Sequence, residues 1–304
     1  MAANPADDDN ILLAKVENVR SVVTLLKAIS FKNKTICEIN DQGLKFTTEE
    51  AHCAQAHAYL KSRLFDEYHY TPDQDETRTI FALDLEDMIE CLTIFGGSSL
   101  VPFATNKDGS TTGVGAGSGG GNALYGNRVK ENNVTSLRMS FKRSREELTL
   151  MLEDGGVLTV CRLPTSDAES NLEMDQEFRN QPLVSKVIVA SEWLKNSFHE
   201  TDRTAEYVSL LISPDAPYFR ISAMSAPGET QMDYPKTSDV IEAFQSDATQ
   251  LFKYKYQMLE PSFKALASST KTALKINQIG LLHMQFLIPT SETDTCFVEY
   301  LASS

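Results

Sequence analysis

One pair of acidic residues has the spacing for metal-dependent chemistry: Asp84 and Glu86, in the segment FALDLE (81–86). Two carboxylates on a strand can hold two divalent cations that cleave a phosphodiester bond. The same residues also suit the start of a helix. Asp84 would be the N-cap, and Glu86 and Asp87 would lie in the first turn, where negative charge complements the helix dipole. Because no companion motif accompanies the pair, we favour capping and keep a metal-dependent 3′–5′ exonuclease as the alternative.

Two other groups of residues could bind ligands, but their context argues against it. The run GVGAGSGGGN (113–122) contains a G-x-G-x-x-G match, yet no strand precedes it and no helix follows it. His52, Cys53 and His57 are close in sequence, but on a strand the two histidines would point to opposite faces. The five cysteines show no C-x-x-C spacing, which indicates reduced thiols. We therefore expect no catalytic residue, no metal and no cofactor.

Composition limits the classes of partner. The net charge of −14 argues against a tight, autonomous DNA binder, whose affinity would come from neutralising phosphates. It is compatible with a protein that encloses DNA with a locally basic surface. No apolar run approaches the roughly 20 residues that span a bilayer, and MAANPADDDN lacks the features of a secretory signal. We expect no membrane association.

The order of predicted elements repeats. Each half gives a strand, a helix, strands, a second helix and further strands. The first helices centre near residues 25 and 195 and the second near 90 and 265, offsets of roughly 170 to 175 residues. The final strands are offset by only about 138 residues, and one insertion over 97–133, which holds nine of the 15 glycines, explains the difference. The pattern predicts an internal duplication of an α+β unit.

The predicted helices carry polar stripes on one face. Residues three or four apart share a helix face, so a stripe with several cations could contact phosphates if the helices line one concave surface. An ordinary solvated face would have the same pattern. The three stripes are Arg20, Thr24 and Lys27; Glu192, Lys195 and His199; and Lys264, Ser268 and Lys271.

Several segments together resemble a known family. They are NVRSVVTLLKAISF (18–31), LEDMIECLTIFG (85–96), GGVLTVCRLP (155–164), SPDAPYFRIS (213–222), DYPKTSDVIEAF (233–244) and CFVEYLA (296–302). With the duplicated order of elements, they are similar to the Rad-one subunit family of the heterotrimeric nine-one-one checkpoint clamp, within the sliding-clamp superfamily. The resemblance covers nearly the whole chain except the first ten residues and 97–133.

The resemblance implies an architecture and a role. It implies two tandem clamp domains, 1–163 and 183–304, joined by an acidic connector at 164–182, each with two inner helices on antiparallel sheets. It implies a nuclear, non-catalytic subunit that forms a ring with two related subunits around double-stranded DNA. An ATP-dependent clamp loader would place the ring at recessed junctions, and checkpoint and repair proteins would dock on it. A homotrimeric replication clamp stays as a further alternative.

The resemblance also implies three functional surfaces. The DNA-facing residues would be Arg20, Lys27, Lys195, Lys264 and Lys271. The acidic helix from Asp84 departs from the clamp pattern, which puts its share of DNA contact in doubt. Edge strands would form the subunit interface through Leu158, Val160, Met232 and Tyr234, since unpaired edges invite strand addition. A partner-peptide groove would be lined by His52, Cys53, Gln55, Leu172, Met174, Tyr300 and Ala302.

Overall fold

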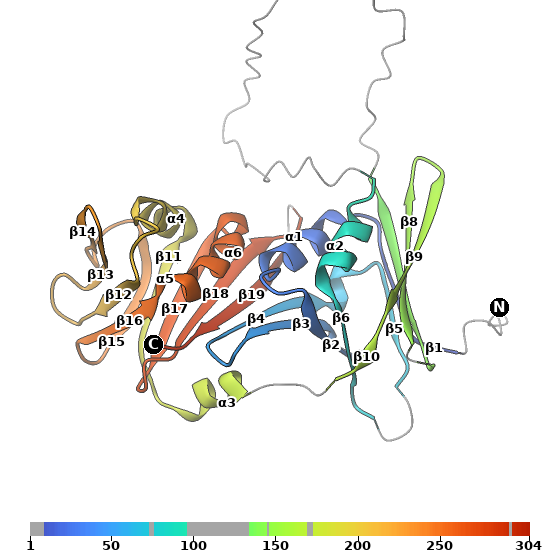
Figure 1. Cartoon of the computed structure of the whole chain (residues 1–304), viewed down its shortest axis with the longest axis horizontal. Coiled ribbons are helices and arrows are strands. Elements are labelled where there is room, and N and C mark those ends of the chain that lie inside the picture. Colours follow the sequence, from blue (N-terminus) through green and yellow to red (C-terminus); the bar gives the residue numbers. More distant parts are fainter. Residues whose placement is uncertain (1–8, 73–75, 96–133, 145, 169–172, 292–293) are drawn as a thin grey trace, which may run out of the picture.

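The structure is a computed structural model that describes residues 9–72, 76–95, 134–144, 146–168, 173–291 and 294–304 (Figure 1). The predicted insertion at 97–133, its glycine run and Leu172 lie outside these residues. The described part consists mostly of antiparallel sheets with few helices, in agreement with the predicted α+β class.

The strands of the first half are β1 (Asn10–Val16), β2 (Lys34–Asn40), β3 (Gly43–Glu50), β4 (Ala54–Lys61), β5 (Glu67–Tyr70), β6 (Thr79–Asp84), β7 (Ser136–Lys142), β8 (Glu147–Asp154) and β9 (Val157–Pro164), followed by the short β10 (Ser166–Asp167). Those of the second half are β11 (Leu183–Ala190), β12 (Tyr207–Ile212), β13 (Phe219–Ser225), β14 (Gly228–Tyr234), β15 (Ile241–Ser246), β16 (Gln250–Lys255), β17 (Lys271–Asn277), β18 (Leu282–Pro289) and β19 (Thr295–Ala302).

The helices are α1 (Arg20–Ala28), α2 (Leu85–Leu92), α3 (Glu173–Asn180), α4 (Ser191–Glu200), α5 (Tyr256–Leu259) and α6 (Phe263–Ser268). Two short 3-10 turns, η1 (Ser62–Leu64) and η2 (Glu260–Ser262), accompany them.

A long central sheet joins the two halves of the chain. Its order is β10-β6-β2-β3-β4-β19-β18-β17-β11-β15, and β4 of the first half pairs directly with β19 of the second. A second sheet, β5-β1-β7-β8-β9, stands at one end of the molecule, and a third, β14-β13-β12-β16, stands at the other (Figure 1).

Helices α1, α2, α4 and α6 all lie on one side of the central sheet, whereas α3 crosses the opposite side (Figure 1). The apolar residues of α1 face the sheet, with Val22, Leu25 and Leu26 fully buried. In the strands, buried and partly exposed residues alternate, as β2 and β17 illustrate, because successive side chains point to opposite faces. The four helices and the strand residues beneath them therefore share one core.

Two local features were predicted correctly. Asp84 caps α2, since its Oδ1 accepts a hydrogen bond from the Asp87 N–H at 3.0 Å. The turn between β2 and β3 depends on Gly43, whose φ is +134°. A Cβ there would lie 2.1 Å from the Leu60 carbonyl oxygen, so no other residue fits without movement of the backbone.

Other local features differ from simple sequence patterns. Ser191 has a residue type that often caps helices, but it is the first helical residue of α4, and its buried hydroxyl shares a hydrogen bond of 2.8 Å with Thr272. The connector, expected only as an exposed acidic segment, contains β10 and α3. Strands β5 and β15 were also not predicted, because β5 has only four residues and the apolar alternation of β15 is weak.

Candidate nucleic-acid interface and subunit edges

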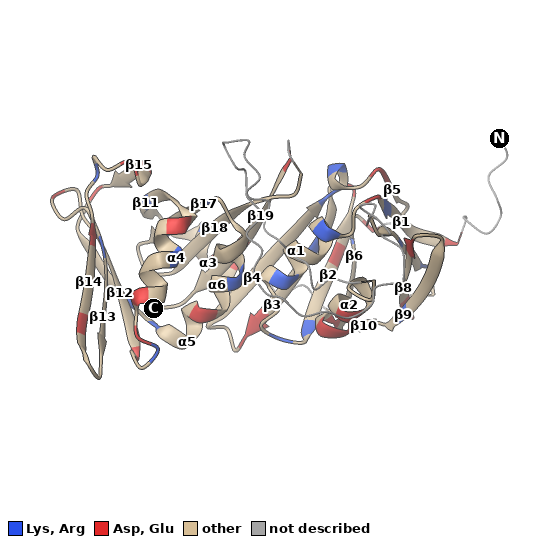
Figure 2. Ribbon diagram, turned by 90° about the horizontal axis from the view of Figure 1, so that it is seen from above, with Lys and Arg blue, Asp and Glu red and all other residues tan. Residues whose placement is uncertain are grey.

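The face that carries α1, α2, α4 and α6 holds most of the expected DNA-facing residues. Helix α1 contacts both α2 and α6, and α6 contacts α4, so the helices form a continuous row. Arg20 on α1, Lys195 on α4 and Lys264 on α6 are exposed on this row, and Lys27 on α1 is partly exposed. Figure 2 shows cationic residues on α1 and α6 and acidic residues on α2. The row is therefore basic at its centre and acidic at α2.

A depression of about 700 Å³ lies between α1, α2 and α6. Lys27, Lys32 and Lys264 line it from one side, and Glu86 and Glu90 of α2 line it from the other. The sequence analysis missed Lys32, which follows α1 and makes an ion pair of 2.8 Å with Glu50. The sequence Lys-Asn-Lys at 32–34, shortly after α1, was the signal that could have identified Lys32. Lys27 and Lys264 supply positive charge on the α1 and α6 side of the depression, while Glu86 and Glu90 oppose it on the α2 side.

Lys264 and Lys271 do not share a helix face, contrary to expectation. The Lys264 ammonium donates to the Ser30 carbonyl oxygen at 2.6 Å, which fixes α6 beside the end of α1. Helix α6 ends at Ser268, and Lys271 is the first residue of β17. The side chain of Lys271 forms an ion pair of 2.8 Å with Glu242 of β15. Since buried Thr272 next to it faces the helices, Lys271 points to the opposite face.

The acidic residues at α2 have a structural role in this geometry. Asp84 is occupied as the cap of the helix, and Glu86 lies exposed in the first turn. Within the described residues, no three or more His, Cys, Asp and Glu side chains are arranged so that they could hold a metal ion. The arrangement therefore agrees with the capping interpretation of the acidic pair.

The two expected edge strands lie at opposite ends of the molecule (Figure 1). In the described part of the chain, β9 pairs in its sheet only with β8, and β14 pairs only with β13. Leu158 and Val160 of β9 are 57% and 40% exposed, which is unusual for large apolar side chains in a strand. Strand β9 thus presents an apolar stripe beside a row of backbone groups with no partner strand.

The expected contacts on β14 are placed differently. Met232 is partly buried and packs against the core. Tyr234 is only 8% exposed; its ring stacks on Phe219, and its hydroxyl makes a short hydrogen bond with Ser197 of α4. Alternation turns both residues toward the core, so Tyr234 is not an exposed interface residue. The backbone of β14 and its outward residues, such as Gln231, form this edge.

The expected peptide groove is largely closed. Gln55, Met174, Tyr300 and Ala302 are all buried. Met174 of α3 packs with Leu281, Leu301 and Phe178, which holds the connector helix against the sheet. Tyr300 and Ala302 lie on the other face of β19, turned toward the helices. These four residues therefore do not line an open groove in this structure.

Two of the groove residues remain accessible. His52 is exposed in the β3–β4 turn, where its φ is +56° and its Nδ1 lies 3.0 Å from Glu49. Cys53 beside it is partly exposed. His57, in contrast, is buried and shares a hydrogen bond of 3.0 Å with Thr47, and burial holds the pKa of its imidazole well below the usual value. The two histidines are separated, but not by strand alternation as expected, because His52 lies in the turn before β4 begins at Ala54.

A polar cluster crosses the junction between β4 and β19. The Tyr59 hydroxyl donates to Glu299 at 2.9 Å, Gln285 donates to the same carboxylate at 3.0 Å, and His283 lies 3.7 Å away. Burial raises the pKa of Glu299, but hydrogen bonds and positive charge outweigh it, so the pKa falls to about 2. Glu299 is thus a partly buried anion held by several donors where the two halves meet.

The comparisons with known proteins identify the family. The family model described as "Repair protein Rad1/Rec1/Rad17" matches residues 11–288, and the chain belongs to this family. The family expected from the sequence is therefore confirmed.

Three relatives indicate how broadly the family extends. The chain is 35% identical to human "Cell cycle checkpoint protein RAD1", over 97% of this chain and 92% of that protein. It is 23% identical to Schizosaccharomyces pombe "DNA damage checkpoint control protein rad1", over 93% and 83%. It is 24% identical to Mycosarcoma maydis "DNA repair exonuclease REC1", over 91% and 88%. The chain therefore aligns with nearly the full length of the human protein.

None of the helices among the described residues has the length and apolar composition needed to cross a membrane.

Proposed function

We propose that the chain is a non-catalytic subunit of a ring-shaped checkpoint clamp that encircles DNA. The checkpoint function expected from the sequence agrees with the names of the human and S. pombe relatives. In the proposed ring, the chain combines with two related subunits, and an ATP-dependent loader places the ring at recessed or damaged DNA junctions. Checkpoint and repair proteins then dock on its outer face. These events place its action in the nucleus.

The observation that carries the proposal is the repeated order of strands. The first half contributes the orders β5-β1-β7-β8-β9 and β6-β2-β3-β4, and the second half contributes β15-β11-β17-β18-β19 and β16-β12-β13-β14. The two sets correspond strand for strand, with α1 and α2 equivalent to α4 and α6. This correspondence supports two tandem clamp domains, 1–163 and 183–304, with residues 164–182 as the connector.

The same correspondence predicts how subunits join. Within the chain, β4 ends one four-stranded unit and pairs antiparallel with β19, which ends a five-stranded unit. The equivalent strands at the two ends of the molecule are β14 and β9. In the proposed ring, β14 of one subunit pairs with β9 of the next in the same way as β4 pairs with β19 within the chain. Repeating this pairing from subunit to subunit closes the ring and leaves no edge strand unpaired.

The helix row then faces the centre of the ring. Its cations, Arg20, Lys27, Lys195 and Lys264, would contact phosphates only weakly, which suits an acidic chain. A closed ring stays on DNA because it cannot dissociate without opening. Strong contacts are therefore unnecessary, and acidic α2 need not touch DNA.

The name of the M. maydis relative contains the word exonuclease. In this chain, Asp84 serves as a helix cap, and this observation supports a non-catalytic subunit over a nuclease.

The test is the mass of the full chain alone and after mixing with the two related clamp subunits, measured by light scattering on a sizing column. A monomer alone and a one-to-one-to-one complex in the mixture are expected. A trimer of this chain alone would indicate a replication-type clamp instead. A monomer that ignores both partners would refute the proposal.

A further inference from the structure

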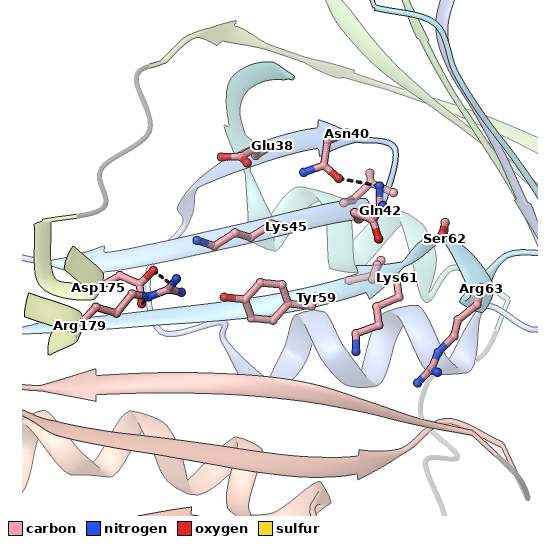
Figure 3. Close-up of a pocket in the computed structure, with 13 residues that line it drawn as sticks. Glu38, Asn40, Gln42, Lys45, Tyr59, Lys61, Ser62, Arg63, Asp175 and Arg179 are labelled. Carbon is pink, nitrogen blue, oxygen red and sulfur yellow. Dashed lines mark hydrogen bonds and ion pairs between the residues drawn. The ribbon is translucent and has the colours of Figure 1, made fainter. Parts of the chain in front are cut away.

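A polar pocket lies on the outer face, away from the helix row and from both edge strands. Its volume is about 600 Å³, and it extends from the β2–β3 turn along β3 and β4 to helix α3 (Figure 3). The expected peptide groove begins at His52 and Cys53, in the turn at the opposite end of β3 and β4. The pocket shares helix α3 with the expected groove but lies at the other end of β3 and β4.

Four cations line the pocket in a chain whose net charge is −14. They are Lys45, Lys61, Arg63 and Arg179. Figure 3 shows Arg179 at one end, Lys61 and Arg63 at the other, and Lys45 between them beside Tyr59. This concentration of positive charge on an acidic protein makes the pocket the natural place for an anion to dock.

The two carboxylates of the pocket already have cationic partners. Asp175 pairs with Arg179 at 3.0 Å, and Glu38 pairs with Arg78 at 3.3 Å. Within the described residues, Lys45, Lys61 and Arg63 form no ion pair with a carboxylate. Lys61 lies 5.1 Å from the centre of the Phe297 ring, and Arg63 donates to the Thr295 carbonyl oxygen at 3.2 Å. Among the described residues, none of these three cations therefore has a direct carboxylate partner, although Asp175, Glu38 and Glu299 lie near enough to Lys45 to raise its pKa.

Lys45 is the most desolvated of the three. It is the cross-strand neighbour of Glu38 and of Tyr59, and its ammonium lies 5.7 Å from the centre of the Tyr59 ring. Burial lowers the pKa of Lys45, while Asp175 and Glu38 raise it. A bound anion beside Lys45 would compensate this desolvation, because an opposite charge favours the protonated amine.

We propose that this pocket binds an acidic peptide segment of a partner protein, with Lys45, Lys61 and Arg63 contacting its carboxylate or phosphoryl groups. The ring of Tyr59, which lines the pocket among the cations, suits a peptide with an apolar side chain among its acidic residues. Glu38 and Asp175 also line the pocket and would oppose an unbroken row of phosphates, whereas a peptide can place neutral or apolar residues beside them. This inference adds a binding site to the proposed clamp and does not depend on ring closure.

The experiment measures fluorescence anisotropy of a short labelled Glu-rich peptide that contains a phenylalanine, titrated with the full chain. A second peptide carries phosphoserine in place of glutamate, and a single-stranded oligonucleotide is the third probe. Lys61→Glu and Arg63→Glu are each expected to weaken peptide binding roughly tenfold, since each removes a charge-assisted contact. Lys61→Arg should retain binding, and Lys253→Glu, an exposed lysine of β16, is the matched control.

Arg63→Gln provides a milder variant if Arg63→Glu fails to fold, which melting curves will report. Sensitivity to Lys61 and Arg63 but not to Lys253 supports the site, and the two peptides distinguish carboxylate from phosphoryl recognition. The proposal would be overturned if Lys253→Glu lost as much peptide affinity as the pocket variants, or if the pocket variants bound the peptides like the wild type. Binding of the oligonucleotide but of neither peptide would also overturn it. All pocket variants should still assemble with the partner subunits, so failure here differs from failure of the clamp proposal.

Discussion

Tyr59 donates a hydrogen bond of 2.9 Å from its hydroxyl to the carboxylate of Glu299, although the two residues are 240 positions apart in the chain. Tyr59 belongs to β4 and Glu299 to β19, the two strands whose pairing unites the halves of the molecule. The bond is therefore a polar link across the internal junction that, in the proposed ring, is the counterpart of the junction between subunits.

Replacing Glu299 by glutamine should flatten the dependence of stability on pH. The folded-state pKa of Glu299 is about 2, below its ordinary value, so its stabilisation is present above the unfolded pKa and is lost as pH falls from about 5 to about 2. Glu299→Gln should cost about 2–3 kcal/mol at neutral pH and less at pH of about 3. Urea unfolding at both pH values measures this, with exposed Glu206→Gln as the control. Equal losses at both pH values would contradict the assignment.

Substitution of Val160 by aspartate should block assembly but leave the subunit folded. Val160 is 40% exposed on β9, so the free energy of unfolding should change by only about 0.5 kcal/mol. Light scattering of the mixed subunits and a melting curve of the isolated chain measure the two effects. The contrasting variant is Leu163→Asp, since Leu163 of the same strand is buried and its replacement should unfold the subunit. A large loss of melting temperature for Val160→Asp would show that Val160 belongs to the core.

Charge reversal should distinguish Lys27 from Lys271, although the family resemblance placed both among the DNA-facing residues. Lys27→Glu on the helix row should weaken retention of DNA by the assembled ring and reduce its salt dependence, by a slope of about one per lost phosphate contact. Lys271→Glu should leave retention unchanged, because Lys271 pairs with Glu242 on the opposite face. The measurement is ring dissociation from linear DNA over a range of salt concentrations. Equal effects of both variants would remove the helix row from the DNA interface.

Asp84 should behave as a helix cap. Asp84→Ala should lower stability by about 1 kcal/mol, whereas Asp84→Asn should cost less, because asparagine also caps well. Thermal unfolding measures the difference. A magnesium-dependent nuclease activity of the wild-type protein that both variants abolish would instead support the exonuclease alternative.

Two glycines with positive φ should differ in their tolerance of a side chain. Gly43→Ala should destabilise the protein by roughly 3 kcal/mol or more, for two reasons. The new Cβ would clash with the Leu60 carbonyl oxygen, and alanine is unfavourable at the positive φ of this position. Gly156→Ala should cost only about 1–2 kcal/mol, because no atom lies within 4 Å of its added Cβ. Chemical denaturation of the two variants provides the comparison. Similar losses would indicate that backbone strain alone determines both.

The sequence alone determined the local elements and the family. Helical spacing in α1, the Asp84 cap and the glycine turn at Gly43 follow from interactions between residues close in the chain, so short-range patterns predicted them. The family resemblance rested on segments spread over nearly the whole chain, and the family model confirmed it.

Only the tertiary structure decided which side chains are accessible. Tyr234 was assigned correctly to its strand, whereas Lys271 was assigned to a helix and is the first residue of β17. The register of β14 turns Tyr234 into the core, and the end of α6 leaves Lys271 on the opposite face. Met174 closed the expected groove because the connector formed an amphipathic helix that packs on distant Leu301. The outer pocket combines Lys45 and Lys61 with Arg179, more than 100 residues away. Such proximity depends on long-range strand pairing, which short-range sequence patterns do not encode.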